Sequence, residues 1–119
     1  MKTIIAGSRN ITVADVVESA IEKSGFQISD VISGGARGVD LLGERWARDN
    51  NLPITRFVAE WDRFGKSAGY IRNKRMAAYG DALIAVWNGR SRGTKHMIEE
   101  ANKLGLKVFV YNLEEVIGD

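Results

Sequence analysis

The chain has 119 residues, 45% of them hydrophobic and 27% charged, which is typical of one globular domain, and we expect residues 1–119 to form that domain. The absence of cysteine and the single histidine, His96, exclude disulfides, cysteine nucleophiles and zinc sites with several histidine ligands, so we expect no metal and no cofactor. The net charge of +2 is too small to predict nucleic-acid binding, and the lack of a signal peptide or of an apolar run of about 18–20 residues predicts a cytoplasmic protein outside the membrane.

Short apolar segments alternate along the chain with segments whose apolar residues recur at helical spacing. The first predicted helix begins after Thr12, a good N-cap residue, and ends at Gly25. The second begins near Val39 and ends before Pro53, and Gly43 in its interior indicates close contact with the sheet. The predicted strands are residues 3–6, 28–33, 54–58, 82–87 and 107–111.

The second half of the chain continues this alternation after an irregular segment. Residues 59–69 combine aromatic, charged and glycine residues, which predicts a long functional loop. Helices are expected over residues 70–79 and from Thr94 to Gly105, and residues 113–117 predict a terminal turn or short helix. The alternation predicts an α/β fold: a single Rossmann-like three-layer α/β/α sandwich with a five-stranded parallel sheet in the order 3-2-1-4-5.

Glycine-rich loops with arginine follow three of the predicted strands. The most informative reads Gly34-Gly35-Ala36-Arg37-Gly38-Val39-Asp40, and it leads from a strand into a helix. Glycine lets the backbone approach a phosphate, and the first amides of a helix lack internal partners. Because the carboxyl ends of parallel strands share one edge, these loops are expected to form a crevice for a phosphate-bearing ligand. The candidate binding residues are Gly7, Ser8, Arg9, Gly34, Gly35, Arg37, Gly38, Asn73, Gly89, Arg92, Gly93 and Thr94.

Several of these residues also have a purely structural interpretation. Glycines can serve only the turns, exposed arginines can be solvated, and Thr94 can cap the helix that follows it. Asp40 either favours the helix dipole or binds ribose hydroxyls. His96 is either a packing residue or a general acid–base group.

Residues outside the glycine loops leave further alternatives. Trp61 and Phe64 in the irregular segment either stack a base or close the core. Arg72 and Asn73 follow the third strand and are placed to reach the crevice, although a solvated helical face is the alternative. Glu44 is expected to be solvated.

Three motifs in the same order resemble the SLOG superfamily and, more closely, its YspA-type branch. They are the loop 34–40, the segment Ile71-Arg72-Asn73-Lys74-Arg75-Met76-Ala77, and the pair Gly93-Thr94 that leads into a helix. The resemblance covers essentially the whole chain. It implies a Rossmann-like fold that binds nucleotide-derived ligands and, for the YspA-type branch, ligands related to NAD or ADP-ribose.

The superfamily includes cytokinin-activating phosphoribohydrolases, which cleave the N-glycosidic bond of nucleoside monophosphates. Their conserved arginine resembles Arg72, and their Pro-Gly-Gly-x-Gly-Thr loop partly resembles residues 89–94, where the proline is absent. Their catalytic glutamate after the Gly-Thr pair is also absent, since His96 and Met97 stand there. Asp40, Glu44 or Glu99 would have to replace it.

Three functions therefore compete. The first is a sensor or processing module that binds a nucleoside monophosphate, ADP-ribose or an NAD-related ligand. The second is an N-glycosidase in which Arg72, His96 and Asp40 are catalytic. The third is single-stranded DNA binding, which the resemblance implies because the DNA-processing protein of natural transformation, another relative, binds single-stranded DNA. The low net charge makes nucleic acid the least expected partner. The resemblance also implies a homodimer through helical faces, to which Trp46 or Tyr79 would contribute.

Overall fold

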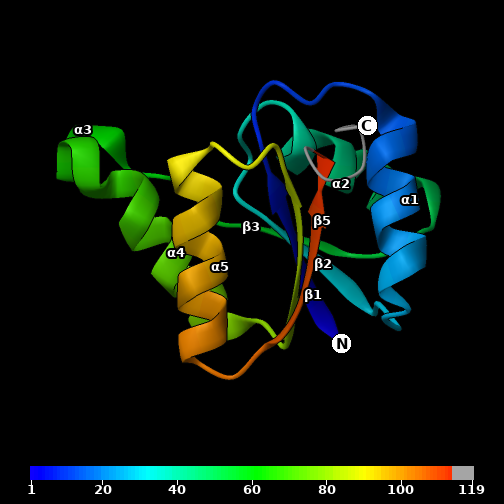
Figure 1. Cartoon of the computed structure of the whole chain (residues 1–119). Coiled ribbons are helices and arrows are strands. Elements are labelled where there is room, and N and C mark those ends of the chain that lie inside the picture. The colour runs from blue at the N-terminus through cyan, green and yellow to red at the C-terminus, as the bar shows by residue number, and fades with distance from the viewer. Residues whose placement is uncertain (114–119) are drawn as a thin grey trace.

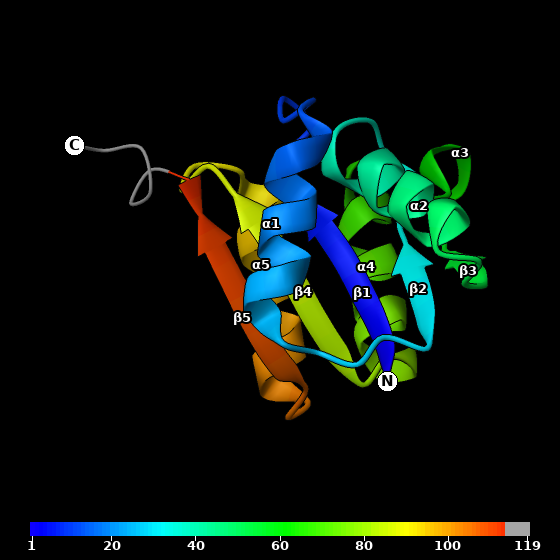
Figure 2. The same cartoon turned by 90° about the vertical axis from the view of Figure 1, so that its right-hand side faces the viewer.

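Five parallel strands form one sheet in the order β3-β2-β1-β4-β5 in the computed structural model of the chain, which describes residues 1–113. Figure 2 shows the strands side by side, with α1 and α2 in front of them. The strand β1 pairs with both β2 and β4, so the order of the strands reverses beside it. The predicted sheet and its order are confirmed. The strands are β1 (Lys2–Gly7), β2 (Asp30–Ser33), β3 (Ile54–Arg56), β4 (Ala82–Trp87) and β5 (Lys107–Asn112).

Helices cover both faces of the sheet (Figure 1). The helices α1 (Ala14–Ser24) and α2 (Val39–Asp49) lie on one face, and α4 (Ala68–Tyr79) and α5 (Arg92–Lys103) lie on the other. This arrangement confirms the Rossmann-like α/β/α sandwich. Across residues 1–113, no helix is long and apolar enough to cross a membrane.

Successive residues of the central strands point to opposite layers, so the sheet has an apolar core on each side. Ile5 and Ile84 belong to the core under α1 and α2, whereas Ile4 and Leu83 belong to the core under α4 and α5. All four side chains are fully buried. Because β1 and β4 are packed on both faces, the loops at their carboxyl ends start from fixed positions.

Two glycine predictions are confirmed and one cap prediction is wrong. A Cβ at Gly43 would lie 2.7 Å from Cγ2 of Ile5, so α2 needs a glycine where it crosses the sheet. Gly25 ends α1 with a left-handed φ of 68°. The helix α1 begins at Ala14 after an extended Val13, and Thr12 does not cap it. The buried Ile11 anchors the preceding loop in the core, which delays the first helical turn.

The segment expected to be a long loop is partly helical. It contains α3 (Trp61–Phe64) and a 3-10 turn, η1 (Gly65–Ser67), and α4 begins at Ala68, two residues before the predicted start. Neither α3 nor η1 contains a buried residue. Figure 1 shows α3 standing out beside α4, away from the sheet. The predicted terminal turn over residues 113–117 lies outside the described residues, apart from Leu113.

The two aromatic residues proposed for a dimer contact lie in opposite layers. Trp46 is partly buried against the core under α1 and α2. Tyr79 ends α4, is 40% exposed, and has the Lys2 Nζ atom 4.1 Å from its ring centroid. The homodimer stays a prediction.

Candidate functional site

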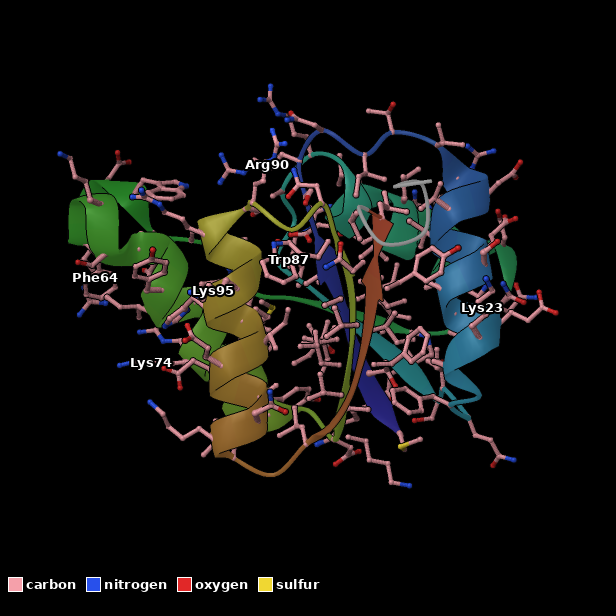
Figure 3. The ribbon with its side chains drawn as sticks, viewed as in Figure 1. Lys23, Phe64, Lys74, Trp87, Arg90 and Lys95 are labelled. Atoms are coloured by element: carbon pink, nitrogen blue, oxygen red, sulfur yellow. The ribbon has the colours of Figure 1, made fainter. Side chains whose placement is uncertain are left out.

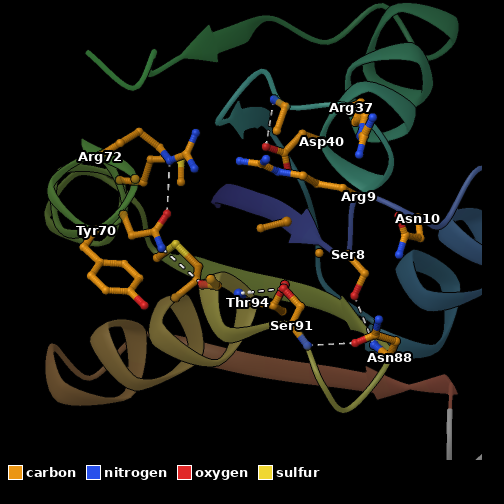
Figure 4. Close-up of a pocket in the computed structure, with 18 of the residues that line it drawn as sticks. Ser8, Arg9, Asn10, Arg37, Asp40, Tyr70, Arg72, Asn88, Ser91 and Thr94 are labelled. Carbon is orange, nitrogen blue, oxygen red and sulfur yellow. Dashed lines mark hydrogen bonds between the residues drawn. The ribbon is translucent and has the colours of Figure 1, made fainter. Parts of the chain in front are cut away.

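A cavity of about 680 Å³ opens at the carboxyl ends of β1 and β4, where the strand order reverses (Figure 4). The loops after β1, β2 and β4 line it, together with η1 and the N-terminal turns of α4 and α5. Ligands of open parallel sheets bind at this place. The lining includes the predicted residues Gly7, Ser8, Arg9, Arg37, Asp40, Arg72, Asn73, Gly93 and Thr94.

The remaining predicted residues lie outside this lining. Gly34 and Gly35 line an adjoining hollow of about 530 Å³, whereas neither lining contains Gly38, Gly89, Arg92 or His96. The lining also contains polar residues outside the predicted binding set, namely Asn10, Lys66, Tyr70, Asn88, Arg90 and Ser91. The role of Ser91 could have been predicted from the sequence, because a serine three residues before the first buried residue of a helix is a common N-cap.

Ser8 connects the loops after β1 and β4. Its amide donates to the Val86 carbonyl at 3.1 Å, and its hydroxyl accepts from the Asn88 amide at 3.2 Å. A Cβ at Gly7 would lie 2.1 Å from the Val86 carbonyl oxygen. Gly7 therefore permits the close approach of the two strand ends, which is a packing role.

The loop 34–40 uses much of its hydrogen-bonding capacity inside the protein. The Gly35 amide donates to Ser33 Oγ at 3.0 Å, and the Ala36 amide donates to Asp40 Oδ2 at 3.1 Å. The Val39 amide, at the start of α2, donates to the Ser8 carbonyl at 3.4 Å. These amides are therefore not available to a phosphate. The glycine-rich loop that stood out in the sequence acts mainly as a wall of the cavity.

The N-terminus of α5 differs in this respect. Ser91 is its N-cap, and its hydroxyl accepts from the Thr94 amide at 3.3 Å and from the Thr94 hydroxyl at 3.0 Å. The alternative in which Thr94 is the cap is wrong. In the described chain, the amides of Arg92 and Gly93 have no acceptor, as is usual for the first residues of a helix. A Cβ at Gly93 would meet no atom within 4 Å, so the backbone is open to a ligand there.

Arg72 and Asn73 connect α4 to the loops on both sides of the cavity. Arg72 donates to the Gly34 carbonyl at 2.9 Å and, through Nε, to Asn73 Oδ1 at 3.1 Å. The Asn73 amide group donates to the Gly93 carbonyl at 3.2 Å and lies 3.2 Å from Nδ1 of His96. Burial lowers the pKa of Arg72, and the nearby Asp40 opposes that shift.

His96 lies behind this pair. Its Nε2 atom is 3.3 Å from Oε1 of Glu100, and its ring packs against Tyr70 with centroids 4.3 Å apart. The structure thus brings His96 next to Asn73 and does not bring it to the cavity lining.

A buried carboxylate fixes the base of the loop 34–40. Glu44 is 3% exposed, accepts from Ser33 Oγ at 2.6 Å, and accepts from the Arg56 guanidinium at 2.5 and 2.9 Å. Burial alone would raise the pKa of Glu44, but these hydrogen bonds outweigh it and lower the pKa. The expectation that Glu44 is solvated is wrong, because two strands bring Ser33 and Arg56 to it and no sequence spacing reveals that meeting.

The cavity is strongly cationic although the chain as a whole is not. The cationic side chains in its lining are Arg9, Arg37, Lys66, Arg72 and Arg90, against the single carboxylate of Asp40. Figure 4 shows Arg72 and Arg9 approaching Asp40 from different sides, and Figure 3 shows Arg90 at the same edge of the sheet. Among the described residues, the side chains of Arg9, Arg37 and Arg90 form no hydrogen bond or ion pair.

Asp40 is 6% exposed and has an unusual acidity for an aspartate. Burial raises its pKa to about 6. The hydrogen bond from the Ala36 amide and the charge of Arg72 lower the pKa, and the charge of Glu44 adds to the raising effect of burial. The carboxyl group therefore exchanges its proton near neutral pH. Such perturbed groups are typical of functional sites.

Asp40→Asn is expected to raise the free energy of unfolding above about pH 6 and to change it little below about pH 4. The pKa of Asp40 is about 6 when folded, against an ordinary value of 3.8, so the folded state binds the proton more tightly. The stabilisation from protonation is full below the ordinary value and is lost as the pH rises through the folded value. A shift of this size corresponds to roughly 3 kcal/mol, which urea unfolding across this range measures.

Asp62→Asn, at an exposed position on α3 outside the cavity lining, is the matched control. Its effect on the free energy of unfolding should be small at every pH. A difference between the wild type and Asp40→Asn that does not vary with pH would contradict the raised pKa.

The comparisons with known proteins identify the family of the chain. A family model described as "YspA, cpYpsA-related SLOG family" matches residues 1–64. The Gene 61 protein of Mycobacterium phage D29 is 37% identical over 117 residues, which cover 90% of this chain and 93% of that protein. No solved structure matches the chain significantly. The chain belongs to the YspA, cpYpsA-related SLOG family.

Proposed function

We propose that the protein binds a phosphate-bearing nucleotide or nucleotide-sugar in the cationic cavity, as a sensor or processing module. Membership of the SLOG family suggests a nucleotide-related function. The observation that supports the finer proposal is that unpaired cationic side chains and Gly93, whose amide is unpaired, line the same cavity.

The phosphate is assigned to the N-terminus of α5. The amides of Arg92 and Gly93 and the hydroxyls of Ser91 and Thr94 lie at this end of the helix, and the helix dipole favours an anion there. Arg90 precedes the helix on the same loop. Loop amides and a guanidinium group together suit the three oxygens of a terminal phosphate.

The sugar is assigned to the middle of the cavity. Asp40 is the one carboxylate in the lining, and a carboxylate accepts hydrogen bonds from the two hydroxyls of a ribose. Arg9 and Arg72 lie on either side of it and would hold a second phosphate where the ligand has one (Figure 4). A cavity of about 680 Å³ is of the size that usually holds a ligand of this kind.

Asp40 also favours a second candidate function, hydrolysis of the N-glycosidic bond of a nucleoside monophosphate. A carboxyl group with a pKa of about 6 is suited to proton transfer near neutral pH. In that reaction water attacks C1′, the bond to the base breaks, and the base leaves with a proton. Free adenine released from adenosine monophosphate by the wild type, and not by Asp40→Asn, would establish this second candidate.

Removal of two unpaired guanidinium groups should weaken nucleotide binding without harming the fold. In the double variant Arg9→Ala and Arg90→Ala, the dissociation constant for ADP-ribose, which carries a second phosphate, is expected to rise tenfold or more, since hydrogen bonds to charged groups contribute about 1.5–3 kcal/mol each. Isothermal titration calorimetry at low salt measures the change.

Arg45→Ala is the matched control, because Arg45 is exposed on α2 and lines only a shallow depression away from the cavity. Its affinity should equal that of the wild type. If the wild type binds neither adenosine monophosphate nor ADP-ribose, nucleotide binding in this cavity is contradicted.

Gly93→Ala is expected to have opposite effects on stability and on ligand affinity. The added methyl group meets no protein atom within 4 Å, so the substitution should stabilise α5 by about 0.4–1 kcal/mol, the usual gain when alanine replaces a helical glycine. The same methyl group stands where the phosphate would approach the backbone, so the affinity for adenosine monophosphate should fall about tenfold.

Thermal unfolding and calorimetry on the same samples give both quantities. Asn102→Ala, an exposed change on α5 outside the cavity lining, should leave the affinity unchanged. A Gly93→Ala protein that is as stable as expected and still binds adenosine monophosphate with full affinity would contradict a phosphate site at the N-terminus of α5.

A further inference from the structure

We infer that Trp61 is the stacking platform for the base of the bound nucleotide. This inference rests on the proposed nucleotide binding and makes it more specific, because it assigns the part of the ligand that the polar end of the cavity does not contact. Trp61 would then select ligands that carry an aromatic base over those that carry only a sugar and a phosphate.

The exposure of Trp61 has no explanation in the fold. Its side chain is 51% exposed, and it lines both the cavity and the adjoining hollow of about 530 Å³. A large aromatic side chain gains most when it is covered, so a half-bare tryptophan in a cavity wall points to a ligand or partner that covers it.

The segment that carries Trp61 contributes nothing to either core. Neither α3 nor η1 buries a residue. Glu60 anchors the segment to α4 through an ion pair with Arg75 at 3.1 Å. The guanidinium groups of Arg63 and Arg75 lie 4.8 and 5.8 Å from the Phe64 ring centroid. Phe64 is thus used to hold the segment in place, and Figure 3 shows it on the outer side of the molecule, whereas Trp61 is left for the cavity.

The start of α4 accommodates the indole ring. A Cβ at Gly69 would lie 3.4 Å from Cη2 of Trp61 and 3.8 Å from Nη2 of Arg72, so the ring edge rests close to the helix backbone beside a guanidinium group. Gly69, Tyr70 and Arg72 all line the cavity. The ring is therefore fixed at one edge and borders on the cationic part of the cavity.

The order of groups along the cavity matches the order of groups in a nucleotide. The hydroxyls of Ser91 and Thr94 lie at the β4–α5 end, and Asp40 and Arg72 come from α2 and the first turns of α4. Trp61 comes from the segment after β3, at the other edge of the sheet. Phosphate, ribose and base would meet an anion site, a carboxylate and an aromatic face in that sequence. Every base has a π face, so stacking predicts a preference for a base and not for one particular base.

The test compares adenosine monophosphate with ribose 5-phosphate, which lacks the base. For the wild type, adenosine monophosphate should bind about tenfold or more tightly than ribose 5-phosphate, the effect expected of one stacked base. Trp61→Ala should lose that preference by weakening only the binding of adenosine monophosphate, and Trp61→Phe should retain much of it. Isothermal titration calorimetry measures the six dissociation constants, two for each of the three proteins.

Tryptophan fluorescence gives a second readout. Adenosine monophosphate should quench the emission of the wild type, and most of the quenching should disappear in Trp61→Phe. It should persist in Trp46→Phe, because Trp46 packs against the core under α1 and α2.

The outcomes separate this inference from the proposed function. Equal affinities for the two ligands, unchanged by Trp61→Ala, would overturn the stacking role and leave phosphate binding intact. Binding of neither ligand would overturn both. A Trp61→Ala protein with unchanged affinities and a smaller sedimentation mass than the wild type would show that Trp61 belongs to an interface between copies of the chain.

Discussion

The contacts of Ser8 hold together the three loops that build the cavity. This buried residue donates to Val86, accepts from Asn88 through its hydroxyl, and accepts from the Val39 amide through its carbonyl, so it joins the loops after β1, β4 and β2. Gly7 and Gly38 permit the close backbone approach that these bonds need. Hydrogen bonds between buried groups hold geometry firmly, because an unpaired buried group is costly.

These contacts between the loops determine which backbone amides remain available to a ligand. The loop 34–40 and the start of α2 use their amides on Ser33, Asp40 and Ser8, whereas the start of α5 keeps two amides unpaired. Arginines from three loops and α4 surround the same space. The unpaired amides therefore favour an anion at α5, and Asp40, whose pKa is about 6, is the lining group that can change its charge near neutral pH.

The alternation of apolar and amphipathic segments was sufficient to predict the sheet, its order and the edge where the cavity lies. Spacing along the chain does not report on groups that meet across it, so the Ser33–Glu44–Arg56 cluster and the Arg72–Asn73 bridge were not foreseen. For the same reason the glycines after β2 resembled a phosphate loop, although packing and φ explain them: Gly38, with φ of 81°, fits against the Ser8 carbonyl. Trp61 lay in a segment without periodicity, so the sequence left base stacking and closure of the core as alternatives, and the structure places Trp61 in the cavity wall.

Amide chemical shifts of the isotopically labelled protein during a titration with adenosine monophosphate test the central claim most directly. The amides of Arg92 and Gly93 should shift the most, and ribose 5-phosphate should shift the same pair, because both ligands place a phosphate at the N-terminus of α5. Shifts concentrated in the amides of residues 34–40, with Arg92 and Gly93 unaffected, would contradict a phosphate site at α5.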